Sequence, residues 1–142
     1  MAKKVLVVVA RFYNDIADEL LEGAVIELEK NKVNYEVVEV PGAFEIPAAI
    51  KFAIGGKKYA GFVALGCVIR GETTHYDYVC QESARGLQHL ALEFSAAIGN
   101  GIITVENREQ AMARALKSKK NKGGGAALAC ITMMKLKKRF SK

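Results

Sequence analysis

An alternation between two hydrophobic periods runs along the whole chain and limits its fold more than any other feature. Residues 5–9 read Val-Leu-Val-Val-Val, a continuous apolar run rich in β-branched side chains, which is typical of a strand covered on both faces. Ile16, Leu20, Ala24 and Leu28 then recur at helical spacing, with acidic residues between them. This segment therefore predicts a buried strand followed by an amphipathic helix.

The same scheme recurs along the rest of the sequence. Asn107 with Gln110, and Thr74 with Asp77, have the spacing of N-terminal capping boxes. Because no linker divides the 142 residues, we predict one α/β domain over residues 1–142, with a parallel sheet and helices on both of its faces. Further strands are predicted at residues 33–40, 61–69 and 98–105, and further helices at residues 45–54, 75–95, 107–116 and 126–140.

The positive charge of the chain is concentrated at one end. The formal net charge is +6, but nine of the 21 Lys and Arg residues lie between residue 117 and the C-terminus, a segment without Asp or Glu. The preceding part has twelve basic and fifteen acidic residues. A solvated lysine-rich helix face and a polyanion contact both fit the basic segment. It carries one aromatic residue, Phe140, whereas nucleic-acid binders often place several among their basic residues, so we expect no nucleic-acid partner.

The cysteine, histidine and hydropathy patterns indicate a reduced, metal-free protein of the cytoplasm. Cys67, Cys80 and Cys130 are widely spaced and form no Cys-x-x-Cys pair, and His75 and His89 fit no zinc template. No apolar run reaches the roughly 18–20 residues of a membrane span, and no signal-peptide cleavage site follows the short apolar run near the N-terminus. We therefore expect no metal, no membrane partner and a cytoplasmic location.

Candidate site residues lie in the loops that follow the predicted strands, because ligands of parallel sheets bind outside the carboxyl ends of the strands. Phe12 follows the first strand, where its ring can either stack on a planar ligand or cap the core. Glu45 lies in the second such loop, after Gly42 and Ala43. It is either an acceptor for ligand hydroxyls or a carboxylate that interacts with a helix dipole.

The loop at residues 70–77 combines features of an anion site with a group that transfers protons. Two hydroxyls and a glycine lie where the free amides of a predicted helix N-terminus emerge, which favours an anion. His75 in the same turn is either a proton-transfer group near neutral pH or a surface loop histidine. Arg114, followed by Lys122, is either a phosphate ligand or a solvated arginine at a helix end.

Five segments carry a more specific pattern, in order over nearly the whole chain. They are residues 11–14 (Arg-Phe-Tyr-Asn), 40–47 (Val-Pro-Gly-Ala-Phe-Glu-Ile-Pro), 66–80 (Gly-Cys-Val-Ile-Arg-Gly-Glu-Thr-Thr-His-Tyr-Asp-Tyr-Val-Cys), 101–107 (Gly-Ile-Ile-Thr-Val-Glu-Asn) and 121–123 (Asn-Lys-Gly). Together they resemble the 6,7-dimethyl-8-ribityllumazine synthase family. The resemblance implies a three-layer flavodoxin-like sandwich with a four-stranded parallel sheet. It also implies a transferase without cofactor or metal that joins 5-amino-6-(D-ribitylamino)uracil to 3,4-dihydroxy-2-butanone 4-phosphate. This reaction is the penultimate step of riboflavin biosynthesis and releases phosphate and water.

The resemblance further implies roles for individual residues. His75 would be the catalytic residue that transfers protons. The expected substrate-binding residues fall into three groups. Phe12 would stack on the pyrimidine ring, with Cys67, Val68 and Ile69 beside the uracil; Ala43, Phe44 and Glu45 would hold the ribityl chain; and Glu72, Thr73, Arg114 and Lys122 would lie around the phosphate. Asn100 is a further expected substrate-binding residue.

The family also implies an assembly and shows where this sequence departs from its pattern. Active sites in the family lie between neighbouring subunits, so we expect a homopentamer with shared sites; some members assemble twelve pentamers into a 60-subunit shell. Asn100 stands where many members carry an aromatic residue that closes the neighbour's site, and Gly124 and Gly125 replace a bulkier stretch. A storage shell with little turnover is the alternative to an enzyme, and the presence of His75 and Arg114 favours the enzyme.

Overall fold

Four parallel strands form the central layer of the computed structural model, which describes residues 3–141. The strands are β1 (Lys4–Ala10), β2 (Tyr35–Val40), β3 (Tyr59–Ile69) and β4 (Ile98–Val105). Their order across the sheet is β2-β1-β3-β4, and every neighbouring pair is parallel. The predicted four-stranded parallel sheet is confirmed, and β2 and β4 form its two edges.

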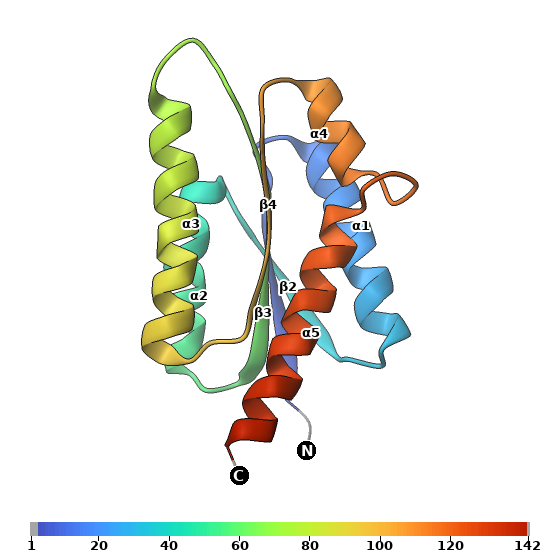
Figure 1. Cartoon of the computed structure of the whole chain (residues 1–142), viewed down its shortest axis with the longest axis vertical. Helices are drawn as coiled ribbons and strands as arrows, with labels where there is room; N and C mark the ends of the chain where they lie inside the picture. Colours follow the sequence, from blue (N-terminus) through green and yellow to red (C-terminus); the bar gives the residue numbers. More distant parts are fainter. Residues whose placement is uncertain (1–2, 142) are drawn as a thin grey trace.

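Helices cover both faces of this sheet. They are α1 (Asn14–Lys30), α2 (Ile46–Gly55), α3 (His75–Phe94), α4 (Arg108–Ala115) and α5 (Lys122–Phe140), and a short 3-10 helix at Ala43–Glu45 precedes α2. Figure 1 shows α2 and α3 on one face of the sheet and α1, α4 and α5 on the other. The arrangement confirms the predicted three-layer α/β sandwich and is consistent with a flavodoxin-like fold. Within residues 3–141, no helix combines the length and the apolar character needed to cross a membrane.

The two faces of the sheet have separate apolar cores. Val5, Val7 and Val9 of β1 are buried with α1 and α5, whereas Leu6 and Val8 are buried with α2 and α3. Burial of each such side chain contributes about 1.5–3 kcal/mol, so β1 is held from both sides. The loops at the carboxyl ends of the strands are therefore attached to a rigid base.

The last helix begins earlier than predicted. We expected residues 123–125 to form a loop before a helix at residue 126, and this prediction is wrong because α5 begins at Lys122. Asn121 has a left-handed backbone (φ 47°), and its Oδ1 accepts a hydrogen bond from Gly124 N–H at 3.2 Å. Gly123 lies against the backbone of Leu20 in α1, where a Cβ atom would collide. This glycine therefore permits close packing of α1 and α5 rather than a turn.

Of two other predicted boundaries, one is wrong and one is confirmed. The second strand begins at Tyr35, later than expected, because Val33 N–H donates to Leu28 O at 3.0 Å and so belongs to the end of α1. The cap predicted for α4 is confirmed, since Asn107 Oδ1 accepts a hydrogen bond from Gln110 N–H at 2.9 Å.

Candidate functional site

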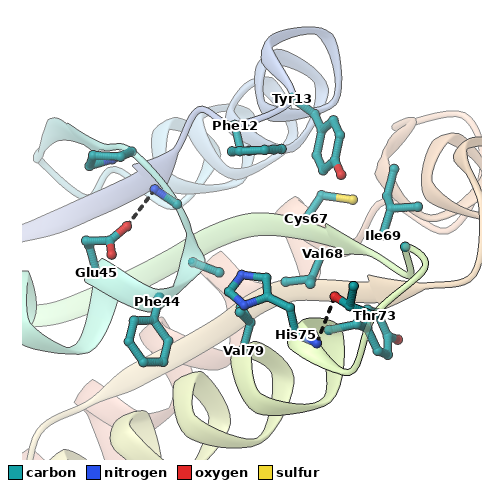
Figure 2. Close-up of a pocket in the computed structure, with 15 residues that line it drawn as sticks. Phe12, Tyr13, Phe44, Glu45, Cys67, Val68, Ile69, Thr73, His75 and Val79 are labelled. Carbon is teal, nitrogen blue, oxygen red and sulfur yellow. Dashed lines mark hydrogen bonds between the residues drawn. The ribbon is translucent and has the colours of Figure 1, made fainter.

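A cavity of about 440 Å³ lies at the carboxyl ends of β1, β2 and β3 (Figure 2). Its walls come from the loops that follow these strands and from the start of α3. This is the edge of a parallel sheet at which ligands bind. We call it the strand-end pocket. Nine of the residues predicted from the sequence line it: Phe12, Ala43, Phe44, Glu45, Cys67, Val68, Ile69, Thr73 and His75.

The aromatic side chain that follows β1 forms an open platform on this pocket. Phe12 is 73% exposed and stands over the cavity in Figure 2. The ring of Tyr13 packs edge-on against it, with ring centroids 5.0 Å apart and 78° between the ring planes. The interpretation that Phe12 caps the core is therefore wrong. Tyr13 also lines the pocket, a role that we did not predict although its position next to Phe12 was a signal for it.

The loop after β2 places a carboxylate at the other end of the pocket. Glu45 is exposed, and one of its oxygens, Oε1, accepts a hydrogen bond from Gly42 N–H at 3.0 Å. This bond fixes the direction of the carboxylate and occupies one of its oxygens. The other oxygen can accept hydrogen bonds from ligand hydroxyls, since an ionised carboxylate is an acceptor only.

The loop after β3 brings a histidine and a helix N-terminus to the pocket. His75 is the first residue of α3, and its imidazole projects into the cavity (Figure 2). Thr73 Oγ1 accepts a hydrogen bond from His75 N–H at 3.3 Å. The predicted capping box of Thr74 and Asp77 is wrong: Thr74 has helical backbone angles and no capping bond, and Asp77 pairs with Arg70 at 3.4 Å. The positive end of the α3 dipole nevertheless lies beside His75, which favours an anion here.

The end of β3 forms an uncharged wall. Cys67 is buried, and desolvation raises the pKa of its thiol to about 12. The group is therefore a neutral thiol at physiological pH rather than a nucleophilic thiolate. Val68 and Ile69 are half-buried beside it, where the strand ends.

Three of the predicted residues, Asn100, Arg114 and Lys122, lie in a second, separate cavity of about 260 Å³. We call it the edge hollow, because residues 100–104 of the edge strand β4 form one of its sides. It shares no lining residue with the strand-end pocket. Neither Arg114 nor Lys122 forms an ion pair with an acidic side chain of residues 3–141. The two charges are thus available to an anion.

One predicted residue, Glu72, lies apart from both cavities, and another, Asn100 of the edge hollow, is bonded to its own strand. Glu72 is exposed in the loop before α3 and lines neither the strand-end pocket nor the edge hollow. Asn100 Oδ1 accepts a hydrogen bond from Ile102 N–H at 2.9 Å. In a strand, the backbone N–H and C=O groups of successive residues point to opposite sides. The carbonyl of Val105 accepts a hydrogen bond from Arg70 N–H, just after β3, and so points toward β3. The N–H of Ile102, three residues earlier, therefore points to the free side of β4.

Comparison with known proteins identifies the family of the chain. The family model described as 6,7-dimethyl-8-ribityllumazine synthase matches residues 2–138. The chain belongs to this family. A 6,7-dimethyl-8-ribityllumazine synthase from Bartonella bacilliformis is 58% identical over 137 residues, which cover 95% of this chain and 90% of the relative. One from Agrobacterium fabrum is 57% identical over 140 residues, with 95% of each chain covered. The 6,7-dimethyl-8-ribityllumazine synthase 1 of Rhizobium meliloti is 56% identical over 141 residues, which cover 96% of this chain and 92% of the relative.

As a member of the lumazine synthase family, the chain is a transferase of riboflavin biosynthesis. The ionisable residues predicted for the site that line the two cavities fall into two sets. A histidine and a carboxylate lie in the strand-end pocket, and two cations lie in the edge hollow. Within the described part of the chain, no three His, Cys, Asp or Glu side chains gather closely enough to hold a metal ion.

Proposed function

We propose that this lumazine synthase condenses 5-amino-6-(D-ribitylamino)uracil with 3,4-dihydroxy-2-butanone 4-phosphate to form 6,7-dimethyl-8-ribityllumazine, releasing phosphate and water. The observation that carries the proposal is the composition of the strand-end pocket. It has an aromatic platform, Phe12, a carboxylate, Glu45, and a histidine at a helix N-terminus, His75. These groups match a planar ring, a chain of hydroxyls and a reacting phosphate ester.

The pyrimidine substrate fits the part of the pocket under the aromatic platform. Stacking of a planar ring on Phe12 contributes roughly 0.5–1.5 kcal/mol beyond the area that it buries. The ribityl hydroxyls then donate to Glu45, next to Ala43 and Phe44. The backbone at Val68 and Ile69, where β3 ends, offers hydrogen-bonding groups to the edge of the uracil ring.

The phosphate ester belongs at the opposite side, beside the N-terminus of α3. Thr73 and Glu72 flank that position on the same loop. The cations of the edge hollow, Arg114 and Lys122, lie outside the strand-end pocket of their own chain. We therefore infer that a neighbouring subunit supplies them, in a homopentamer whose sites are shared; a single pentamer and a 60-subunit shell both allow this pairing.

The chemistry requires few catalytic groups. The amine of the pyrimidine attacks the ketone carbon, and His75 takes the amine proton and returns it to the hydroxyl that leaves as water. The resulting imine tautomerises to an enamine, whose electrons expel the phosphate together with the electrons of its carbon–oxygen bond. The enol that remains becomes a ketone, and attack of the ribitylamino nitrogen on this carbon, with loss of a second water, closes the ring of the lumazine. Arg114 and the amides of α3 stabilise the departing charge. Fixing the two reactants in contact supplies much of the acceleration, because it removes the entropic cost of their encounter.

The direct test is to mix the two substrates with the purified protein and to follow the lumazine chromophore by absorbance. The uncatalysed condensation is measured in parallel and subtracted. A rate above this background that saturates with both substrates would support the proposal. A rate equal to the background, together with tight binding of the lumazine product, would instead favour a storage protein.

The shared-site part of the proposal has its own test. Light scattering at micromolar concentration should give the mass of a pentamer or of a larger multiple. A monomeric mass together with full activity would show that one chain completes the site by itself, and would contradict the inference that a neighbour supplies Arg114.

A further inference from the structure

Two arginines, Arg11 and Arg70, have equivalent places in the fold. Each directly follows a central strand, Arg11 after β1 and Arg70 after β3. Each also donates its backbone N–H to the last carbonyl of the adjoining edge strand. The two distances are 3.1 Å from Arg11 to Val40 O in β2 and 2.9 Å from Arg70 to Val105 O in β4.

The guanidinium group of each arginine joins two carboxylates that also have matching places. One belongs to the residue seven positions later in the following helix. Arg11 Nη1 lies 2.6 Å from Asp18 Oδ1 in α1, and Arg70 Nη2 lies 3.4 Å from Asp77 Oδ1 in α3. The shared spacing means that each arginine spans the whole loop between its strand and its helix.

The second carboxylate belongs to a residue next to the last residue of the edge strand: Glu39 precedes that residue in β2, and Glu106 follows it after β4. Arg11 Nε donates to Glu39 Oε2 at 2.6 Å, and Arg70 Nε donates to Glu106 at 3.0 and 3.1 Å. We call the first set (Arg11, Asp18, Glu39) the Arg11 clamp and the second set (Arg70, Asp77, Glu106) the Arg70 clamp. Each clamp joins a central strand, the helix that follows it and the neighbouring edge strand.

The two clamps enclose different parts of the strand-end pocket. The loop spanned by the Arg11 clamp carries Phe12, and the loop spanned by the Arg70 clamp carries His75, as Figure 2 shows for the two side chains on opposite sides of the cavity. The Arg70 guanidinium also lies 4.3 Å from the ring centroid of Tyr76, the residue after His75. Each clamp therefore constrains the backbone next to one functional side chain.

The burial of these groups indicates positioning rather than overall stabilisation. The four carboxylate side chains are 57–64% exposed, and ion pairs in such surroundings contribute little to global stability. The planar guanidinium group nevertheless fixes the orientation of the groups it joins, because its N–H groups form hydrogen bonds with two carboxylates at defined angles.

We propose that Arg11 and Arg70 are positioning residues with divided tasks: the Arg11 clamp holds the aromatic platform, and the Arg70 clamp holds the turn that carries His75. The assignment of kinetic consequences rests on the proposed function, whereas the assignment of each clamp to its own loop does not.

The test uses matched variants, Arg11→Met and Arg70→Met, which keep an unbranched side chain and remove the fork. Arg85→Met is the control, since Arg85 on α3 pairs only with Glu82 and lies away from both cavities. The first measurement is hydrogen exchange of backbone amides. Arg11→Met should speed exchange at residues 11–17 and leave residues 70–77 unchanged, and Arg70→Met should do the reverse. Faster exchange in both loops, or in neither, would overturn the proposal.

The second measurement separates the kinetic parameters. Arg70→Met should lower kcat about tenfold and change KM for the pyrimidine less than about twofold, because misplacement of a catalytic group slows the reaction itself. Arg11→Met should raise KM for the pyrimidine about fivefold with little change in kcat. Equal changes in both variants, or changes no larger than in Arg85→Met, would reject the division of tasks. If the unsubstituted protein forms no lumazine, the proposed function fails, and the exchange data alone decide on the clamps.

Discussion

The strand-end pocket and the edge hollow differ in almost every physical respect. The first has aromatic and aliphatic walls, a thiol held neutral by burial, one carboxylate and one histidine. The second is polar, runs along an unpaired strand edge and contains two cations without acidic partners among residues 3–141. The difference teaches that this chain keeps its aromatic platform and its histidine apart from the two cations of the edge hollow. A reaction that needs both kinds of group has to bring two such surfaces together.

Replacing the histidine tests the chemistry of the strand-end pocket and has the largest expected effect. His75→Ala should slow turnover by roughly ten- to a thousandfold, with substrate binding mostly retained, because general acid–base help is typically about 10²–10⁴ and part of this reaction proceeds unaided. Steady-state kinetics with the background rate subtracted measures it. His89→Ala is the control, since His89 is exposed in α3 and lines neither cavity. An unchanged rate in His75→Ala would remove this residue from the mechanism.

Replacing the arginine tests whether the edge hollow is the anion side. Arg114→Ala should raise KM for the butanone phosphate by about 10–100-fold, because a charge-assisted hydrogen bond is worth about 1.5–3 kcal/mol. KM for the pyrimidine should stay within about twofold of the parent value. Arg139→Ala, at the exposed end of α5, is the matched control. A selective loss of pyrimidine affinity would show that the edge hollow binds the pyrimidine rather than the butanone phosphate.

Mixing the two impaired variants, assayed with the butanone phosphate far below its KM, tests whether the two surfaces meet between chains. If a site takes His75 from one subunit and Arg114 from its neighbour, an equal mixture of His75→Ala and Arg114→Ala chains, unfolded and refolded together, should regain about a quarter of the parent activity. Each variant refolded alone supplies the baseline. Activity no higher than the mean of the two baselines would mean that each chain uses only its own residues.

The neutral wall of the strand-end pocket leads to the smallest expected effect. Burial raises the pKa of Cys67 and of Cys130 to about 12, whereas a thiol in an unfolded chain ionises near ~8.5. Above that value the unfolded chain releases protons that the folded chain retains. The contribution of the two thiols to stability should therefore be constant below pH 8 and fall as the pH rises from about 9 toward 12. Urea unfolding at a series of pH values measures the slope. Cys67→Ala should make this slope shallower, and an equally steep slope would show that Cys67 is not buried in solution.

The sequence predicts one of these two regions far better than the other. The strand-end pocket follows from a general rule, because parallel strands bring their carboxyl ends and the following loops to one edge; Phe12, Glu45 and His75 could be found in this way. Arg114 and Lys122 were found as charges, but their separation from His75 depends on β4 being an edge strand, and hydrophobic periodicity does not reveal strand order.

The errors in the prediction have a common physical origin. A glycine-rich stretch has the composition of a loop. Gly123 is instead required by the close packing of α1 against α5, a tertiary contact that the local sequence does not reveal. The Thr74–Asp77 spacing fits a capping box, but Arg70, seven residues before Asp77, pairs with its carboxylate instead. Tyr13 is aromatic like its neighbour Phe12 and lies in the same loop, and only the fold shows that its ring faces the same cavity. Local sequence patterns thus predict helices and strands well, but they predict poorly which residues contact one another in the fold.

The hydrogen bond from Ile102 N–H to the side-chain oxygen of Asn100 bears on how the chain avoids aggregation. An unpaired strand edge is a template on which another strand can add, and a flat edge of this kind leads to insoluble assemblies. On β4, the Asn100 side chain occupies a backbone donor that an incoming strand would need. On the opposite edge, β2 carries the charged side chains of Glu36 and Glu39, which an added strand would remove from water. The two edges are therefore protected by different means, a self-supplied acceptor on one and hydrated charged side chains on the other.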